Sequence, residues 1–231
     1  MEKLAIFVEG YTELLFVERL VEEIAGRNKV LIDLKKIRGG SNIPRKMITI
    51  KAGKDTGQKY YVLLVDCGGD EQVKSRIMQE HDNLTKAGYS KLIGIRDVSP
   101  SFLHTDIPKL QANLPKYIKT KLAPVSFILS IMEIEAWFLA EISHFSKIDT
   151  AITVDAINAR LGFDIEKDDI EQRTYPARDL HVCYSIAGKA YVKSQAKITV
   201  DVLDYEAIYI GLRTRIDYLG ILISDIDSFL K

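Results

Sequence analysis

The sequence predicts an α/β protein in which a parallel sheet with helices on both faces is followed by a mainly helical C-terminal part. Three observations lead to this prediction. Short apolar runs alternate with amphipathic segments over the first 130 residues. Two of these runs end in acid-bearing turns, and the pattern becomes mainly helical after residue 131. Alternation of strands and helices is typical of parallel sheets with right-handed crossovers.

The predicted elements follow in chain order. Continuous apolar runs of about four to eight residues suit parallel strands buried on both faces, and they predict strands at 3–8, 30–37, 60–66, 91–96 and 125–130. Helices are predicted at 12–26, 43–52, 70–87 and 106–121, and then at 133–142, 153–161, 178–195 and 201–230. In the first helix, Leu14, Val17 and Val21 recur at helical spacing, with Thr12 as the expected N-cap and Gly26 as the stop.

Composition narrows the class of protein. The 231 residues are 47% hydrophobic and 28% charged, which is ordinary for a globular protein. No apolar stretch reaches the roughly 18 to 20 residues that span a bilayer, and the acidic amino terminus before the first strand does not read as a secretory signal. Cys67 and Cys183 form neither a disulfide framework nor a CxxC pair. We therefore expect a cytoplasmic protein with no membrane partner.

The net charge is zero, but the charges are unevenly distributed. Between Lys35 and Lys59 the chain carries eight basic residues and one acid, and between Lys109 and Lys121 it carries four lysines and no acid. Either run alone is typical of a solvated surface, but two together favour contact with a phosphate backbone. The first run includes Arg38, Arg45 and Lys46, which we predict to bind nucleic acid. The Gly39-Gly40 turn beside them could also present backbone amides to a phosphate.

Two acidic turns follow predicted strands. The first is Glu9-Gly10-Tyr11-Thr12-Glu13, and the second is Asp66-Cys67-Gly68-Gly69-Asp70. If the two strands lie side by side, their acids emerge at the same edge of the sheet, where α/β proteins bind ligands. Clustered carboxylates repel one another unless a cation compensates, so these acids predict a Mg²⁺ or Mn²⁺ site. The alternative is structural: Glu13 suits the first turn of a helix, and Asp66 and Asp70 suit helix caps.

A third acidic group lies among apolar residues in Glu133-Ile134-Glu135-Ala136-Trp137. Unpaired buried charge is costly, so two acids in this setting favour a function, with Trp137 in the core. The alternative is a helix with one exposed acid and one acid in a salt bridge. Asp97, at the end of another predicted strand, is a weaker candidate. Farther along, Lys189 and Lys193 lie four residues apart, on one face of the predicted helix, where either could neutralise charge on a phosphoryl group.

The arrangement of strand, Glu-Gly-x-Thr-Glu, helix and a later strand ending in Asp resembles the TOPRIM fold, a Rossmann-like parallel sheet. The closest resemblance is to stand-alone TOPRIM-like nucleases related to the overcoming-lysogenization-defect family. It implies that Glu9 and Asp66 bind the metal, that Glu9 also acts as general acid or base, and that Glu13 is a second acid. Gly68 departs from the family's Asp-x-Asp pattern, and Asp70 would have to substitute for the missing acid.

The resemblance extends to two later motifs and to function. Related proteins carry a Glu-x-Glu-x-x-Trp segment and a Tyr-x-Lys, which implies that Glu133 or Glu135 completes the metal cluster and that Lys193 is the catalytic lysine. It covers about residues 1–140, the predicted TOPRIM-like domain, with 141–231 as a helical extension packed on it. The implied activity is Mg²⁺-dependent hydrolysis of DNA or RNA, with tRNA among the candidates. The implied setting is anti-phage defence under the control of an ATPase partner, and a homodimer stays open.

Two other functions are consistent with the sequence. The incomplete Asp-x-Asp also suits a catalytically inactive TOPRIM-like structural or regulatory subunit. A phosphate- or nucleotide-binding α/β module of the receiver or flavodoxin-like type is the second alternative, although it explains Glu133 and Glu135 poorly.

Overall fold

The computed structural model describes residues 1–26, 29–40, 43–69 and 72–231. It contains a six-stranded sheet with the order β3-β2-β4-β1-β5-β6. The strands are β1 (Glu2–Val8), β2 (Val30–Gly40), β3 (Ile43–Lys51), β4 (Tyr60–Asp66), β5 (Tyr89–Asp97) and β6 (Val125–Ser130). The described helices of the first half are α1 (Tyr11–Ala25), α2 (Gln72–Lys86) and α3 (Ile107–Asn113). The predicted α/β class is confirmed.

The second half is helical, as predicted. Its helices are α4 (Glu135–Ala140), α5 (His144–Ile148), α6 (Val154–Leu161), α7 (Pro176–Ser185), α8 (Ala196–Val202), α9 (Tyr205–Ile210) and α10 (Asp217–Phe229). Short 3-10 turns lie at His104–Asp106, Ile170–Gln172, Lys193–Gln195 and Leu212–Thr214. Among the described helices, none is long and apolar enough to cross a membrane.

The chain divides into two compact units. The first comprises residues 1–96, 106–129 and 225–231, and the second comprises 97–105 and 130–224. The sequence predicts a domain of residues 1–140 and a helical extension of residues 141–231, and this division stays a prediction. The acidic turns that follow β1 and β4 belong to the first unit, whereas Glu133, Glu135 and Lys193 belong to the second.

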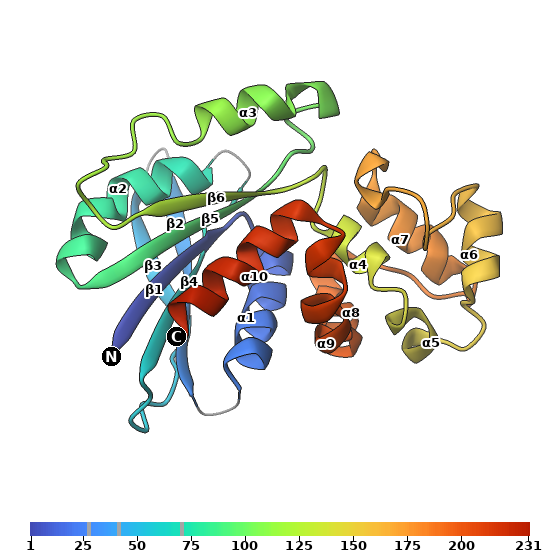
Figure 1. Ribbon diagram of the computed structural model, residues 1–231, viewed down its shortest axis with the longest axis horizontal. Coiled ribbons are helices and arrows are strands. Elements are labelled where there is room, and N and C mark those ends of the chain that lie inside the picture. Colours follow the sequence, from blue (N-terminus) through green and yellow to red (C-terminus); the bar gives the residue numbers. More distant parts are fainter. Residues whose placement is uncertain (27–28, 41–42, 70–71) are drawn as a thin grey trace. The chain divides into compact units, whose positions relative to one another are not determined.

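In the first unit, the parallel strands are buried on both faces. β1 pairs in parallel with β4 and β5, and β2 pairs in parallel with β4. Alternate residues of a strand face opposite sides of the sheet. Phe7 and Val65 pack with Val73 and Ile77 of α2, so Val8 and Asp66, one position along, face the side of α1. Figure 1 shows α1 and α2 on opposite sides of the sheet.

The strand order distinguishes this sheet from a flavodoxin-like sheet. The bonds from Leu92 N to Pro124 O and from Val98 N to Ser130 O advance together along β5 and β6, as parallel strands do. Without the edge strand β3, the parallel strands renumbered along the chain stand in the order 2-3-1-4-5. Flavodoxin-like and receiver folds have the order 2-1-3-4-5. The receiver or flavodoxin-like topology is therefore wrong for this chain, whereas phosphate binding as such is not tested by strand order.

Several predicted elements were wrong in detail. Residues 43–51 form a strand antiparallel to β2, not a helix. The helix predicted at 106–121 ends at Asn113. Pro115 follows two residues later, and it has no N–H to donate to a continuing helix. The helix predicted at 178–195 ends at Ser185, and the one predicted at 201–230 is divided into separate helices.

The first helix begins and ends at glycines. Gly10, not Thr12, precedes α1, and no side chain caps it. Thr12 is instead buried within the first turn. Gly26 ends the helix with a φ of 76°, as the sequence predicted, because glycine adopts positive φ without steric cost.

Candidate active site

The carboxyl ends of β1 and β4 meet at the centre of the sheet. Val8 lies directly opposite Asp66 in the parallel register, so the predicted neighbourhood of the two strand ends is confirmed. The chain leaves β1 towards β2 and leaves β4 towards β5, in opposite directions across the sheet. In α/β sheets, ligands bind at such a switch point, outside the carboxyl ends of the strands. Glu9 and Asp66 therefore stand where the topology favours a site.

Asp66 is fully buried and bound to a lysine that the sequence analysis did not single out. Its Oδ2 accepts a hydrogen bond of 2.7 Å from Lys36 Nζ, and its Oδ1 accepts one of 2.8 Å from the backbone N–H of Gly68. Lys36 lies opposite Asp66 in the register of β2 and β4. This ion pair compensates a carboxylate that would otherwise be buried without a counter-charge.

Glu9 is also buried and lies near a cation. Its Oε1 is 3.9 Å from Nε of Arg96, near the carboxyl end of β5. The backbone carbonyl of Glu9 accepts a 2.9 Å hydrogen bond from Gly69 N, which ties the turn after β4 to the end of β1. Each of the two acids at the switch point therefore has a basic side chain beside it, from β2 for Asp66 and from β5 for Glu9.

The glycines of these turns have separate roles. Gly68 has a φ of 78° and Gly69 a φ of 146°, conformations that favour glycine. Gly10 has an extended φ of −153°, so its small size matters instead: a Cβ there would lie 3.3 Å from Oε2 of Glu13. Glu13 is buried in the first turn of α1, a position that also stabilises the helix dipole.

The described residues do not by themselves form a complete metal site. In the ranges 1–26, 29–40, 43–69 and 72–231, no three His, Cys, Asp or Glu side chains converge as a metal-binding group. Asp70 lies outside the described residues. The carboxylates of Glu9 and Asp66 are oxygen donors of the kind that Mg²⁺ and Mn²⁺ prefer. They fit the donor chemistry of such an ion, which would compete with Lys36 for Asp66.

Cys67, the residue after Asp66, is buried and unsuited to nucleophilic attack. Burial raises the pKa of its thiol, and the carboxylates of Asp66 and Glu9 raise it further. A thiol held in its neutral form is a poor nucleophile. This environment supports the sequence-based view that Cys67 carries no nucleophile signature.

In the second unit, Lys193 binds the acids that follow β6. Its Nζ lies 2.9 Å from Oε1 of Glu133 and 3.5 Å from Oε2 of Glu135. Glu135 is fully buried, and its Oε1 accepts a 2.7 Å hydrogen bond from the hydroxyl of Tyr191. Trp137 is buried, as predicted for a core residue. The sequence predicts that Glu133 or Glu135 completes a metal cluster with the acids of the first unit, and this stays a prediction.

The neighbouring carboxylates favour the protonated, positively charged form of Lys193. Burial lowers the pKa of Lys193, but the carboxylates of Glu135, Glu133 and Asp97 outweigh that effect and raise it. Burial also raises the pKa of Glu135. Lys189 lies outside the helices, and its Nζ donates a hydrogen bond to the carbonyl of Ile148. The predicted shared helix face of Lys189 and Lys193 is therefore wrong. Lys189 pairs with the carboxylate of Asp149 at 3.4 Å, whereas Lys193 pairs with both Glu133 and the buried Glu135.

The three predicted nucleic-acid-binding residues lie on the hairpin of β2 and β3. Arg38 and Lys46 are opposite each other in the antiparallel register, which places their side chains on one face. Arg45 is one residue away from Lys46 and points to the other face. All three side chains are exposed. The structure therefore brings together Arg38 and Lys46, and it separates Arg45 from them.

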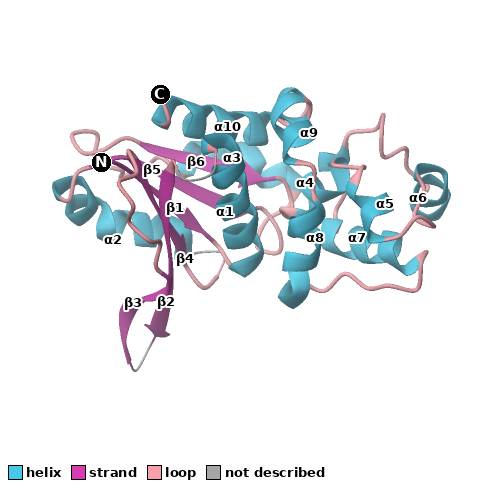
Figure 2. Cartoon of the chain, turned by 90° about the horizontal axis from the view of Figure 1, so that it is seen from below, coloured by secondary structure: helices cyan, strands magenta, loops and turns pink. Residues whose placement is uncertain are grey.

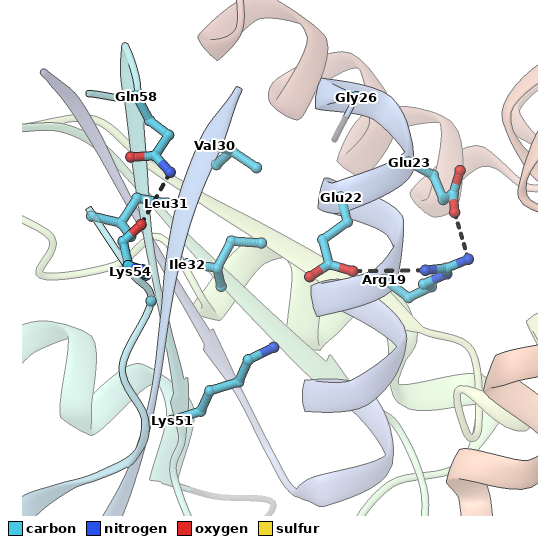
Figure 3. A pocket seen from close by; sticks show the side chains of 11 residues that line it. Arg19, Glu22, Glu23, Gly26, Val30, Leu31, Ile32, Lys51, Lys54 and Gln58 are labelled. Carbon is cyan, nitrogen blue, oxygen red and sulfur yellow. Dashed lines mark hydrogen bonds and ion pairs between the residues drawn. The ribbon is translucent and has the colours of Figure 1, made fainter. Parts of the chain in front are cut away.

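A pocket of about 380 Å³ lies elsewhere in the first unit, between the end of α1 and the beginning of β2. Figure 3 shows Arg19 bonded to Glu22 and Glu23 on one side and the apolar side chains of Val30 and Ile32 on the other. Its charged lining includes both signs. Four residues of β2, or about 13 Å of strand, separate Ile32 from Lys36, so the pocket is distinct from the switch point.

Two residues of the site escaped the sequence analysis as individuals. Lys36 was counted within the basic run, and its position opposite Asp66 follows only from the register of β2 and β4. Arg96 directly precedes Asp97, and no pattern in the sequence distinguishes it. Comparison of the chain with protein-family models, curated proteins and solved structures gave no match.

Proposed function

We propose that this protein is a metal-dependent nuclease of the TOPRIM type, which hydrolyses phosphodiester bonds in DNA or RNA. The observation that carries the proposal is the position of Glu9 and Asp66. These two buried carboxylates follow adjacent parallel strands at the switch point of the sheet. Burial of two neighbouring acids at a ligand-binding edge is costly in a purely structural site and useful for holding a divalent cation.

The residues around the acids would act in distinct ways. Glu9 and Asp66 provide oxygen ligands, and Glu9 is the proposed general acid or base. A bound Mg²⁺ or Mn²⁺ would activate water and stabilise charge on the scissile phosphate. Lys36 and Arg96 carry positive charge to the same edge, which favours the approach of a phosphate. Lys36 also pairs with Asp66 at 2.7 Å and so compensates its charge before a metal binds.

Other parts of the proposal rest on the resemblance alone. They are a role in anti-phage defence, control by an ATPase partner, and a catalytic role for Lys193, whereas the proposed cytoplasmic location rests on the composition of the chain. Lys193 has a fixed positive charge because two carboxylates bind it. Such a cation could neutralise a phosphoryl group, and its participation in the reaction stays a prediction.

A nuclease assay with matched variants tests the proposal. Purified protein is incubated with Mg²⁺ or Mn²⁺ and with plasmid, single-stranded DNA, total RNA and tRNA. We expect cleavage that EDTA abolishes and that Glu9→Gln lowers by about 100-fold or more, as for loss of a catalytic acid or base. Glu22→Gln, on the surface of α1, is the control and should cleave as the unchanged protein does.

If the isolated chain is inactive, the next experiment measures whether a partner activates it. In that case the gene is expressed together with its neighbouring gene, and Glu9→Gln is compared with the unchanged protein for toxicity. Absence of Glu9-dependent cleavage and of Glu9-dependent toxicity would reject the nuclease.

A second candidate, a catalytically inactive TOPRIM-like subunit, is favoured by the environment of Asp66. Lys36 occupies one oxygen of this carboxylate, and Gly68, at the place of the second Asp, supplies only an N–H. The Gly68→Asp variant distinguishes the two candidates. Among the described residues, a Cβ at this position would approach the carbonyl of Ile37, at 3.7 Å, and the φ of 78° strains any side chain there, but aspartate tolerates positive φ better than most residues. In a nuclease, the added acid should strengthen binding of Mg²⁺ without abolishing cleavage. An inactive subunit should show no cleavage with or without it.

A further inference from the structure

The hairpin of β2 and β3 extends beyond the neighbouring strand. The pairing of β2 with β4 ends at Lys36 and Asp66, yet β2 continues to Gly40. Beyond that point it pairs only with β3, through Ile37 with Met47 and Arg38 with Lys46. Figure 2 shows this two-stranded ribbon projecting from the other strands. Because Asp66 is the last residue of β4, the ribbon projects from the edge of the sheet that carries the acids.

Basic side chains line both faces of the ribbon. Lys36 and Arg38 alternate along β2 and share a face with Lys46, the cross-strand partner of Arg38. Lys35 and Arg45 point to the opposite face. Consistent with this placement, the charge of Arg45, after the larger effect of burial, lowers the pKa of Arg76 on α2.

Among the described residues, most of these cations have no acidic partner. Within the part of the chain that the structure describes, no carboxylate lies within ion-pair distance of Lys35, Arg38, Arg45 or Lys46. By contrast, Lys36 near the base of the ribbon is paired with Asp66. The projecting segment therefore has an uncompensated positive charge, which attracts a polyanion.

We propose that this ribbon inserts into the major groove of duplex DNA. The inference rests on the proposed function for its nucleic-acid substrate and adds the class of nucleic acid and the mode of docking. The major groove of B-form DNA, about 12 Å wide, admits a two-stranded β-ribbon. A groove has phosphates along both walls, and cations on both faces of an inserted ribbon reach both of them. A protein that binds along a single phosphate strand needs cations on one face only.

The tip and the position of the ribbon agree with this mode. Ile43, at the start of β3, is 68% exposed, and an apolar side chain can contact the methyl group of thymine in the major groove. A-form RNA has a deep, narrow major groove that side chains do not read, so duplex RNA is a poor fit. A duplex held by the ribbon lies at the edge of the sheet that carries Glu9 and Asp66.

Binding measured without catalysis tests the ribbon separately from the nuclease. Fluorescence anisotropy in EDTA compares a labelled DNA duplex with an RNA duplex of the same sequence over a series of salt concentrations. The test variant is Arg38→Ala with Lys46→Ala. A charge-conserving variant, Arg38→Lys with Lys46→Arg, and a distant double variant, Lys54→Ala with Lys86→Ala, serve as controls. All substituted side chains are exposed, and circular dichroism melting checks each fold.

We expect preferential binding to the DNA duplex, with at least a tenfold loss in Arg38→Ala with Lys46→Ala. The slope of log affinity against log salt should fall in magnitude by about 2, because each lost phosphate contact removes about 0.9. The charge-conserving and distant variants should retain the slope. An unchanged slope in the test variant, or equal binding to the RNA duplex, would overturn the groove-binding ribbon. Binding that depends on Arg38 and Lys46 without Glu9-dependent cleavage would support the docking of the ribbon and reject the nuclease. Glu9-dependent cleavage that is unchanged in Arg38→Ala with Lys46→Ala would support the nuclease and reject the docking of the ribbon.

Discussion

Replacement of Lys36 by methionine should expose the electrostatic cost of the buried acid at the switch point. Methionine keeps an unbranched side chain of similar length and removes the charge. The side chain of Asp66 is 1% exposed, so it would stay buried with the N–H of Gly68 but without its cation. Removal of one partner of a buried ion pair costs about 3 to 5 kcal/mol. Because the side chain of Lys36 is 37% exposed, we expect a loss of unfolding free energy at the lower end of this range, about 3 kcal/mol.

Thermal and denaturant unfolding measure this cost. For a chain of this length, about 3 kcal/mol corresponds to a fall in Tm of roughly 6 to 12 °C. Lys197→Met is the matched control, since Lys197 and Asp201 form an exposed pair one helical turn apart that should contribute about 0.3 to 0.5 kcal/mol. Asp66→Asn together with Lys36→Met should recover most of the loss, because the uncompensated charge is gone. The double-mutant cycle then isolates the ion pair.

The same variant links stability to the proposed metal. A divalent cation bound by Asp66 and Glu9 would replace the missing charge of Lys36, so Mg²⁺ should stabilise Lys36→Met more than the unchanged protein. At a concentration of about 100 times Kd, the gain is about 2.7 kcal/mol. Equal loss in Lys36→Met and Lys197→Met would refute the electrostatic reasoning. A large loss of stability in Lys36→Met that Mg²⁺ does not reduce would refute metal binding at Asp66. It would still support the stabilising role of the Lys36–Asp66 ion pair.

Two further predictions concern the second unit. The pKa of Glu171 is raised to about 7 by burial and by the carboxylates of Asp169 and Asp217. Its ionisation therefore costs nothing below about pH 4, destabilises the fold increasingly up to about pH 7, and has its full effect above that. Glu171→Gln should then raise the free energy of unfolding by at most about 3 kcal/mol at pH 8 and by almost nothing at pH 4, and a pH-independent effect in urea titrations would contradict the reasoning. Lys193→Met should destabilise the fold by about 2 kcal/mol or more, because Glu135 stays buried. Lys189→Met, which disrupts an exposed pair with Asp149, should cost less than about 1 kcal/mol, and similar losses of Tm in the two variants would disprove a structural role of the Glu135 pair.

The parallel strands could be predicted because their signal is local. β1 and β4 contain continuous apolar runs that are followed by Glu9 and Asp66, and burial on both faces requires such runs. The position of Glu9 beside Asp66 was conditional on strand order, which depends on long-range pairing. The structure supplies that order: β1 lies between β4 and β5.

Residues 43–51 show why the edge of the sheet was predicted wrongly. Met47, Ile48 and Ile50 are apolar among basic residues, a pattern that resembles an amphipathic helix. Ile48, Thr49 and Ile50 are β-branched, however, and favour a strand. The segment is exposed on nearly every side chain, so no buried face produces the alternation by which strands are recognised. The preceding Gly39-Gly40 was the stronger signal, because glycines favour the turn of a hairpin.

Lys36 shows why a site can be incomplete in the sequence even when its acids are recognised. In the sequence it is one of eight basic residues between Lys35 and Lys59, and nothing local separates it from its neighbour Lys35. The alternation of side chains along β2 directs Lys35 to one face and Lys36 to the other, and the parallel register with β4 brings Lys36 to Asp66. A shift of one residue in one direction would place Ile37 opposite Asp66 and leave the acid without a cation, and a shift in the other direction would place Lys35 there but turn the other side chains of β2 to the opposite face. The ion pair therefore stabilises the correct register of β2 and β4, and through it the position of the ribbon at the edge that carries the acids.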